Sequence, residues 1–195
     1  YPLRRQFEFP RPAGLKPPVI LYLGGITRDR GLEVILRAMP LVRQRYPEAV
    51  CELVGPVETG DLGPEFADLK PWLEQGNVRL RGKVPYEQVP AILAGSSVAL
   101  VPLLPTLNYQ KAIPVKLLEY MAAGLPVIGS RFGYIEEIVQ RNRCGLLTEP
   151  GDADSLARAI CSLLEEPGQG LQYGQNGWDA FQQEYTWEKE QSKLL

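Results

Sequence analysis

The stretch that decides the fold runs from Pro114 to Gly129 and reads PVKLLEYMAAGLPVIG. Apolar residues recur at helical spacing through its first half, and a proline suits the first helical position, so this half is predicted to be an amphipathic helix. Gly124 ends the helix, and the apolar run that follows is predicted to be a buried strand. A helix leading directly into a buried strand is typical of a parallel sheet with helices on its faces.

The start of this helix is the first candidate for a binding site. Ile113, which precedes it, has no side-chain group that could cap the helix, so the first backbone N–H groups are available to an anion. Lys116 lies in the first turn and Glu119 one turn later, a combination that suits a phosphate beside a hydroxylated group. The alternative is an ordinary amphipathic helix with a Lys–Glu pair on its surface.

Strands and helices alternate on both sides of this stretch. Apolar runs predict strands at residues 19–23, 50–54, 77–81, 98–103, 125–129 and 145–147, and amphipathic runs predict helices at 31–45, 86–94, 134–141 and 152–165. Residues 57–76 are expected to be partly helical, and those after 165 helical with aromatic anchors. The chain is therefore assigned to the α/β class, as a doubly wound, Rossmann-like parallel sheet covered on both faces.

In such a sheet, ligands bind beyond the carboxyl ends of the strands, at the point where the strand order reverses. The first and fourth strands are expected to flank that crevice, which brings the loops 24–30 and 103–113 together. Gly24 and Gly25, with Arg30 before the next helix, would let backbone amides approach a phosphate with a cation beside it. The spacing GGITRDRG is neither the Rossmann fingerprint nor a P-loop, and a glycine pair after a strand also occurs for geometry alone.

Composition excludes several classes of function. The 195 residues carry a formal net charge of −2, which gives no reason to expect nucleic acid as a partner. The chain contains no histidine, so Ser-His-Asp and Cys-His catalysis and most zinc sites are excluded. Asp152 and Asp154 form a D-x-D string, but their place before an apolar periodic run predicts a helix cap rather than a metal site. Three scattered cysteines predict free thiols in a reducing compartment: Cys51, Cys144 and Cys161.

Five stretches together resemble the C-terminal, donor-binding domain of family 4 retaining glycosyltransferases of GT-B architecture. They are LYLGGITRDRGLEVILRAM (21–39), CELVGP (51–56), NVRLRGKVPYEQVPAILAGSSVALVP (77–102), PVKLLEYMAAGLPVIGS (114–130) and CGLLTEPGDADSLARAI (144–160). The resemblance extends from Val19 to about Leu164. It implies a donor substrate that is a nucleoside diphosphate sugar, with no metal ion and no cofactor.

The resemblance also implies roles for particular residues. Glu119 falls on the second acid of the family's Glu-x7-Glu motif, which accepts hydrogen bonds from the ribose hydroxyls. Arg30 matches the basic residue that neutralises the departing diphosphate, a charge-stabilising role that needs no histidine. The other donor-binding positions are the Gly24–Gly25 turn, the loop Gly82, Lys83 and Val84 that contacts the base through its backbone, and the amides of Val115 and Lys116, which face the diphosphate.

Two positions depart from the family's pattern. Lys111 stands where the family carries the first acid of the motif, near the donor sugar, and is the third candidate catalytic residue beside Arg30 and Glu119. Gly25 stands where the family carries a phosphate-binding arginine after the first strand. One cation is thus lost and another is gained across the same crevice. We therefore hypothesise that Lys111 or Lys116 replaces the missing cation. This hypothesis fails if Lys111→Ala and Lys116→Ala both leave nucleotide affinity unchanged.

The resemblance predicts a domain organisation. Residues 1–17, which are rich in proline, are interpreted as an interdomain linker or hinge, and residues 18–195 as the nucleotide-sugar binding domain. The N-terminal acceptor domain is absent from this chain, so the isolated domain is expected to bind donor without transferring sugar. The full-length protein is expected to be a cytoplasmic hexosyltransferase in polysaccharide or glycoconjugate synthesis, with peripheral attachment to the inner membrane face through the absent domain left open.

Two alternatives remain. One is a degenerate, non-catalytic nucleotide-binding or assembly domain, which Gly25 and Lys111 favour and the retained Arg30 and Glu119 oppose. The other is a different GT-B sugar enzyme, such as a nucleotide-sugar 2-epimerase. The absence of histidine counts against the second, because such epimerases generally need histidines and additional acids.

Overall fold

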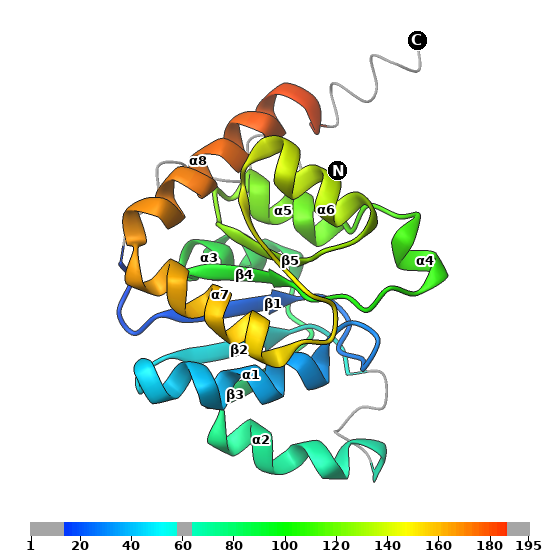
Figure 1. Ribbon diagram of the computed structural model, residues 1–195, viewed down its shortest axis with the longest axis vertical. Helices are drawn as coiled ribbons and strands as arrows, with labels where there is room; N and C mark the ends of the chain where they lie inside the picture. Colours follow the sequence, from blue (N-terminus) through cyan, green and yellow to red (C-terminus); the bar gives the residue numbers. More distant parts are fainter. Residues whose placement is uncertain (1–13, 58–63, 187–195) are drawn as a thin grey trace.

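A computed structural model describes residues 14–57 and 64–186 of the chain. Within these residues, parallel strands form one six-stranded sheet in the order β3-β2-β1-β4-β5-β6 (Figure 1). The strands are β1 (Val19–Leu23), β2 (Val50–Val54), β3 (Val78–Gly82), β4 (Val98–Val101), β5 (Val127–Ser130) and β6 (Gly145–Thr148). The predicted α/β class and doubly wound sheet are confirmed. So is the prediction that β1 and β4 are neighbours where the strand order reverses.

The four inner strands, β1, β2, β4 and β5, bury both of their faces because their sequences are nearly continuous apolar runs, whereas the edge strands β3 and β6 are largely exposed or half-buried. Successive side chains of β1 point to opposite faces of the sheet, so Ile20 and Tyr22 join one hydrophobic core and Leu21 and Leu23 the other. All four residues of β4 are buried, as expected for a strand in the middle of the sheet.

Helices cover the two faces in separate layers. The first core contains residues of α1 (Leu32–Arg45), α2 (Lys70–Gln75) and α7 (Ala153–Glu165). The second core contains residues of α3 (Val89–Ala94), α5 (Val115–Ala122), α6 (Gly133–Asn142) and α8 (Pro167–Glu184). Short 3-10 turns at Pro64–Leu69 and Tyr86–Gln88 precede α2 and α3. None of the helices in the described ranges combines the length and hydropathy that crossing a membrane requires.

The close approach of α8 to α5 depends on glycine. Gly170, Gly174 and Gly177 are buried on α8 at helical spacing. A Cβ atom added at Gly174 would collide with the backbone carbonyl oxygen of Gly124, which follows α5. The two helices can therefore pack this closely only because position 174 carries no side chain.

The structure confirms the predicted helix cap at Asp152 and refines several element boundaries. The Ser155 N–H donates to the Asp152 carboxylate at 2.9 Å, which is the capping interaction at the start of α7. The loop after β4 contains a helix that the sequence did not predict, α4 (Leu107–Gln110), because four residues are too few to show a period. Pro114 is the residue before α5 rather than its first residue. All three cysteines are free, as predicted, whereas residues 1–13 of the predicted linker lie outside the described residues.

Candidate functional site

A cavity of about 360 Å³ lies at the carboxyl ends of β1 and β4, where the strand order reverses. Three segments far apart in the sequence line it: the end of β1 with the loop that follows, the loop after β4, and the start of α5. Five of the predicted site residues are among its lining: Gly24, Arg30, Val115, Lys116 and Glu119. The convergence that the sequence predicted is observed.

A hydrogen bond fixes α5 against the end of β1. The Leu23 N–H donates to the Tyr120 hydroxyl at 2.7 Å, and both groups are buried. Tyr120 is adjacent to Glu119, so this bond sets the position of the helix turn that carries the acid. At the helix start, Pro114 offers no side-chain cap, and the N–H groups of the first turn lack a capping side chain, as predicted.

Gly24 and Gly25 lie directly beneath two cations. A Cβ atom added at Gly24 would lie 3.1 Å from the Lys116 Nζ, and Gly24 also has a left-handed φ of +124°. A Cβ atom added at Gly25 would collide with the Arg30 Nη1. Glycine at these positions therefore serves a purpose beyond the turn itself, because any side chain would displace an amine or a guanidinium from the cavity.

Lys116 has an unusual environment. Its Nζ is buried without a hydrogen-bond partner among the described residues and lies 3.7 Å from the centre of the Tyr22 ring, in a cation–π contact. Burial, with the Arg30 charge as the second cause, lowers the pKa of Lys116 to about 7. The Tyr22 hydroxyl donates to the Gly25 carbonyl oxygen at 2.7 Å, so the ring that supports the amine also holds the glycine turn.

Arg30 is held by two residues that the sequence analysis did not select. Its Nε donates to the Tyr109 hydroxyl at 2.9 Å, and this hydroxyl donates to the Asp29 carboxylate at 3.0 Å. Burial alone would raise the pKa of Asp29, but hydrogen bonds from Thr27 and Tyr109 and the charge of Arg30 outweigh it and lower that pKa. Asp29 therefore stays ionised, and the hydrogen bond to Tyr109 raises the pKa of Arg30.

Glu119 is partly buried at the cavity, one turn after Lys116. Burial raises its pKa, and the Lys116 charge opposes that rise. The pKa of Tyr86 is raised by burial and then by Glu119, which places this half-exposed ring near the acid. A carboxylate in this position can accept hydrogen bonds from a hydroxylated ligand group.

The remaining predicted residues do not line this cavity. Lys111 is exposed at the end of α4. Gly82, with a left-handed φ of +67°, ends β3 at the edge of the sheet, and its carbonyl oxygen accepts from the Gly55 N–H at 2.9 Å. Lys83 and Val84 follow it, two strands from β1. Like the cavity, these residues lie at the carboxyl ends of the strands, but they do not line it.

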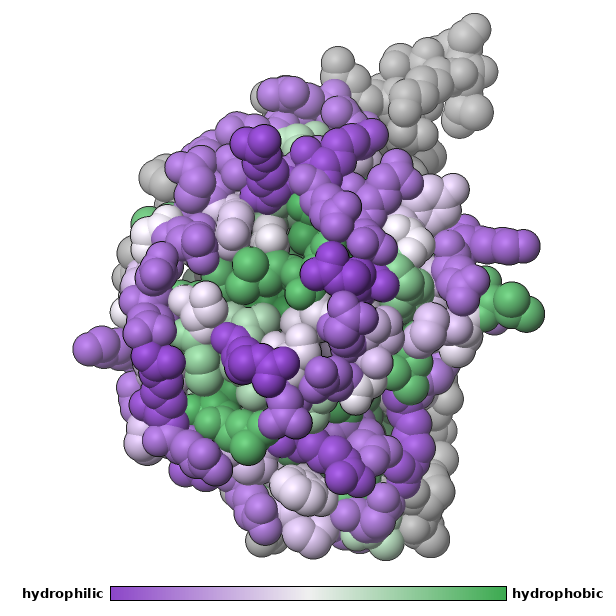
Figure 2. Space-filling view, in the orientation of Figure 1, coloured by the Kyte–Doolittle hydropathy of each residue, from purple (hydrophilic) through white to green (hydrophobic). Residues whose placement is uncertain are grey.

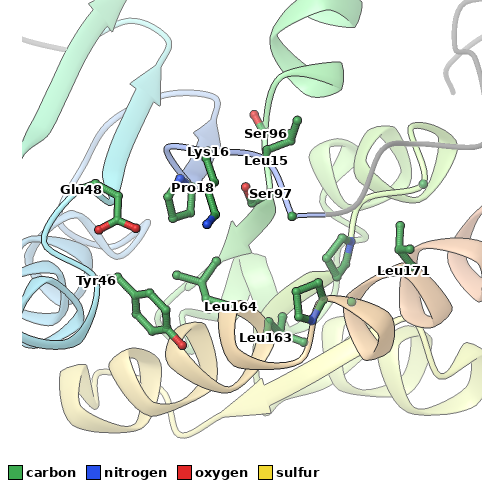
Figure 3. Close-up of a pocket in the computed structure, with 15 residues that line it drawn as sticks. Leu15, Lys16, Pro18, Tyr46, Glu48, Ser96, Ser97, Leu163, Leu164 and Leu171 are labelled. Carbon is green, nitrogen blue, oxygen red and sulfur yellow. The ribbon is translucent and has the colours of Figure 1, made fainter.

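A second cavity, of about 290 Å³, lies at the opposite edge of the sheet and is shown in Figure 3. Leu163 and Leu164 of α7 and Leu171 of α8 are among the residues that line it, and Lys16 and Glu48 are its charged residues. Its two serines already make hydrogen bonds: Ser97 Oγ accepts from the Val19 N–H, and Ser96 Oγ donates to the Ile92 carbonyl oxygen. The carboxyl-end cavity, lined by a guanidinium, an amine and a carboxyl group, is therefore the candidate site.

Comparison with known proteins points to a single family. A family model described as "Glycosyl transferases group 1" matches residues 17–166. The amylovoran biosynthesis glycosyltransferase AmsK of Erwinia amylovora is 32% identical over 155 residues, which is 77% of this chain and 37% of that protein. The chain spans less than half the length of the curated relatives that it matches.

Solved structures show the same fold. Sucrose-phosphate synthase from Thermosynechococcus elongatus superposes with a TM-score of 0.79 at 26% identity, covering 99% of this chain and 50% of that one. Anabaena HepE in complex with UDP superposes with a TM-score of 0.76 at 19% identity, covering 90% of this chain and 47% of that one.

Proposed function

Because the chain belongs to the group 1 glycosyltransferase family and has the fold of a C-terminal GT-B domain, we propose that residues 18–195 bind a nucleoside diphosphate sugar. In this proposal the full-length protein transfers the sugar to an acceptor during polysaccharide or glycoconjugate synthesis. The retaining course of that transfer and its hexosyl type are part of the proposal.

The observation that carries the proposal is the pairing of two cations over adjacent glycines. Arg30 and Lys116 approach from opposite sides of the crevice and lie against Gly25 and Gly24. The uncapped start of α5 opens at the same cavity. Guanidinium, ammonium and free backbone N–H groups are the donors that proteins use for phosphate groups. Such a site suits a diphosphate and needs no metal ion to balance its charge.

Glu119 completes the proposal at the other end of the ligand. A ribose that projects from the diphosphate along α5 would meet this carboxylate one turn further on. During transfer, the sugar loses the diphosphate as leaving group, and Arg30 and Lys116 would stabilise the charge that develops on it. The loop 82–84 is proposed to contact the base, and Lys111 to approach the sugar when the loop after β4 is covered by another domain.

Exposed apolar residues at the cavity support the proposal of a covering acceptor domain. Leu107 on α4 is 78% exposed, and Val115 at the start of α5 is 59% exposed. Figure 2 shows hydrophobic surface at the edge of the molecule where Figure 1 places α4. Exposed apolar side chains beside a binding site favour contact with a partner surface. We propose the N-terminal domain as that partner and expect the isolated chain to bind donor without transferring sugar.

A non-catalytic nucleotide-binding domain is the second candidate, favoured by the exposed Lys111 where the family carries an acid. Both candidates predict nucleotide binding, which is supported by the UDP and UDP-glucose complexes of HepE. They differ in whether the full-length protein turns over its donor.

Thermal unfolding with a panel of UDP, GDP, ADP and their common sugar conjugates tests the proposed site. A ligand at about 100 times its Kd stabilises by about 2.7 kcal/mol, which raises the Tm of a chain of this size by about 5–10 °C. The matched control is Glu48→Ala, an exposed glutamate at the opposite edge of the sheet. One nucleotide should raise the Tm of the wild type and of Glu48→Ala by this amount. The same nucleotide should raise the Tm of Glu119→Ala much less. No response to any nucleotide would contradict the proposal.

A further inference from the structure

The side chain of Tyr109 bridges two neighbouring residues across the crevice. Its hydroxyl accepts from the Arg30 Nε at 2.9 Å and donates to the Asp29 carboxylate at 3.0 Å. Asp29 and Arg30 belong to the loop after β1, whereas Tyr109 belongs to α4, after β4. The bridge therefore links the two loops that follow the neighbouring strands β1 and β4.

Each end of this bridge is fixed by further hydrogen bonds. The Thr27 hydroxyl donates to the other Asp29 carboxylate oxygen, and the Leu104 N–H donates to the Asp29 carbonyl oxygen at 2.9 Å. On the other side, Thr106 caps α4 by accepting from the Tyr109 N–H. Tyr109 and Asp29 are thus oriented independently of Arg30, and Arg30 is the member that they position.

The bridge determines where the guanidinium lies. With Nε bonded to Tyr109, the Arg30 Nη1 lies over Gly25, in the space that a side chain at position 25 would occupy. Neither terminal nitrogen of Arg30 has a hydrogen-bond partner within the described ranges, so both remain available to a ligand. Arg30 thus places a cation directly over the backbone of Gly25.

We propose that Tyr109 is a positioning residue, which, together with Asp29, holds Arg30 over Gly25 to form the phosphate end of the ligand site. This inference deepens the proposed function and rests on it. It assigns a role to α4, and it explains how the guanidinium of Arg30 is kept in the space above Gly25.

A merely structural Tyr109 would anchor α4 without acting on Arg30. A double-mutant cycle separates the two roles, because Tyr109→Phe removes only the hydroxyl. The variants are Tyr109→Phe, Arg30→Met and their combination. Tyr46→Phe is the matched control, because it also removes a tyrosine hydroxyl, one that donates to the Cys161 carbonyl oxygen at the opposite edge of the sheet. The probes are inorganic pyrophosphate, the nucleotide selected by the thermal panel, and its nucleoside.

Tyr109→Phe should weaken the binding of pyrophosphate and of the nucleotide by about 10- to 100-fold, as expected for losing one hydrogen bond to a charged group. It should have no further effect when Arg30 is methionine, and it should leave nucleoside affinity unchanged. An equal loss in both backgrounds, or an equal loss for the nucleoside, would overturn the positioning role.

The Arg30 Nε–H resonance gives a readout that needs no ligand. In nitrogen-15 NMR of the full chain, this resonance is identified by its disappearance in Arg30→Met, and it should shift or exchange away in Tyr109→Phe but persist in Tyr46→Phe. A resonance unaffected by Tyr109→Phe overturns the bridge itself. If pyrophosphate binds with the expected Tyr109 dependence but no nucleotide does, the positioning role stands and the proposed function fails. If neither binds the wild type, both fail.

Discussion

Replacing Lys116 by methionine should stabilise the protein at neutral pH and do so less at pH 9. The Lys116 Nζ is buried without a hydrogen-bond partner among the described residues, and burial lowers its pKa from 10.5 to about 7. Methionine keeps an unbranched side chain against the Tyr22 ring while removing the amine. The variant therefore tests the charge with little change in packing.

The magnitude follows from the two pKa values. In the unfolded chain the amine keeps its proton up to pH 10.5, whereas the folded chain releases it above about pH 7. Between these limits the unfolded state binds more protons, so the free energy of unfolding rises with pH. At 1.36 kcal/mol per pKa unit, the lysine destabilises the fold by about 4 kcal/mol at pH 7 and about 2 kcal/mol at pH 9.

Urea unfolding at the two pH values measures the effect. The stability difference between Lys116→Met and wild type should shrink by about 2 kcal/mol from pH 7 to pH 9. All other titrating groups are shared by the two proteins and largely cancel in this difference. Lys70→Met, at an exposed lysine on α2, is the matched control and should show no such change. A Lys116→Met difference that is the same at both pH values would refute the argument that Lys116 is uncharged above neutral pH.

The remaining predictions concern the same cation and three glycines. Binding of the selected nucleotide at pH 8 should take up about 0.9 proton, because a diphosphate favours the charged amine of Lys116. Calorimetry in buffers of different ionisation enthalpy measures this proton uptake, and Lys116→Met should abolish the uptake. Gly25→Ala should change stability by less than about 0.5 kcal/mol, because only the flexible end of Arg30 must move. The same variant should weaken pyrophosphate binding, and an unchanged affinity would contradict the placement of the Arg30 guanidinium over Gly25. Gly174→Ala should destabilise by about 1–3 kcal/mol in urea unfolding, because its Cβ meets backbone, whereas Gly168→Ala on the same helix meets open space and should not destabilise.

Much of the fold was predictable because it depends on local patterns. Each buried strand is a short apolar run, and the helices between them show a clear period, so the doubly wound sheet and its reversal between β1 and β4 followed from the chain alone. The exception is α4, whose four residues fall below the length at which a period can be recognised. Its Tyr109 was missed for the same reason, and Tyr22 was hidden within an apolar strand.

The candidate site divides in the same way. Its location, and the selection of Arg30, Lys116 and Glu119 as candidates that meet there, followed from the sequence, because the topology of the sheet dictates which loops meet. The sequence left open whether Lys111 or Lys116 compensates for Gly25. In the structure, Lys111 is exposed at the end of α4, while Lys116 and Arg30 lie over the glycine pair.

The sequence by itself therefore determined the class of fold, the edge of the sheet where the candidate site lies and the chemical types of the groups gathered there. Only the tertiary structure shows which cationic groups lie over the glycine pair and how Arg30 is held there. The reason is physical: hydrophobic periodicity is a property of neighbouring residues, whereas the Asp29–Tyr109–Arg30 bridge joins residues about 80 positions apart. The lowered pKa of Lys116 likewise depends on the tertiary structure, because it arises from burial and from the charge of Arg30, a residue 86 positions earlier in the chain.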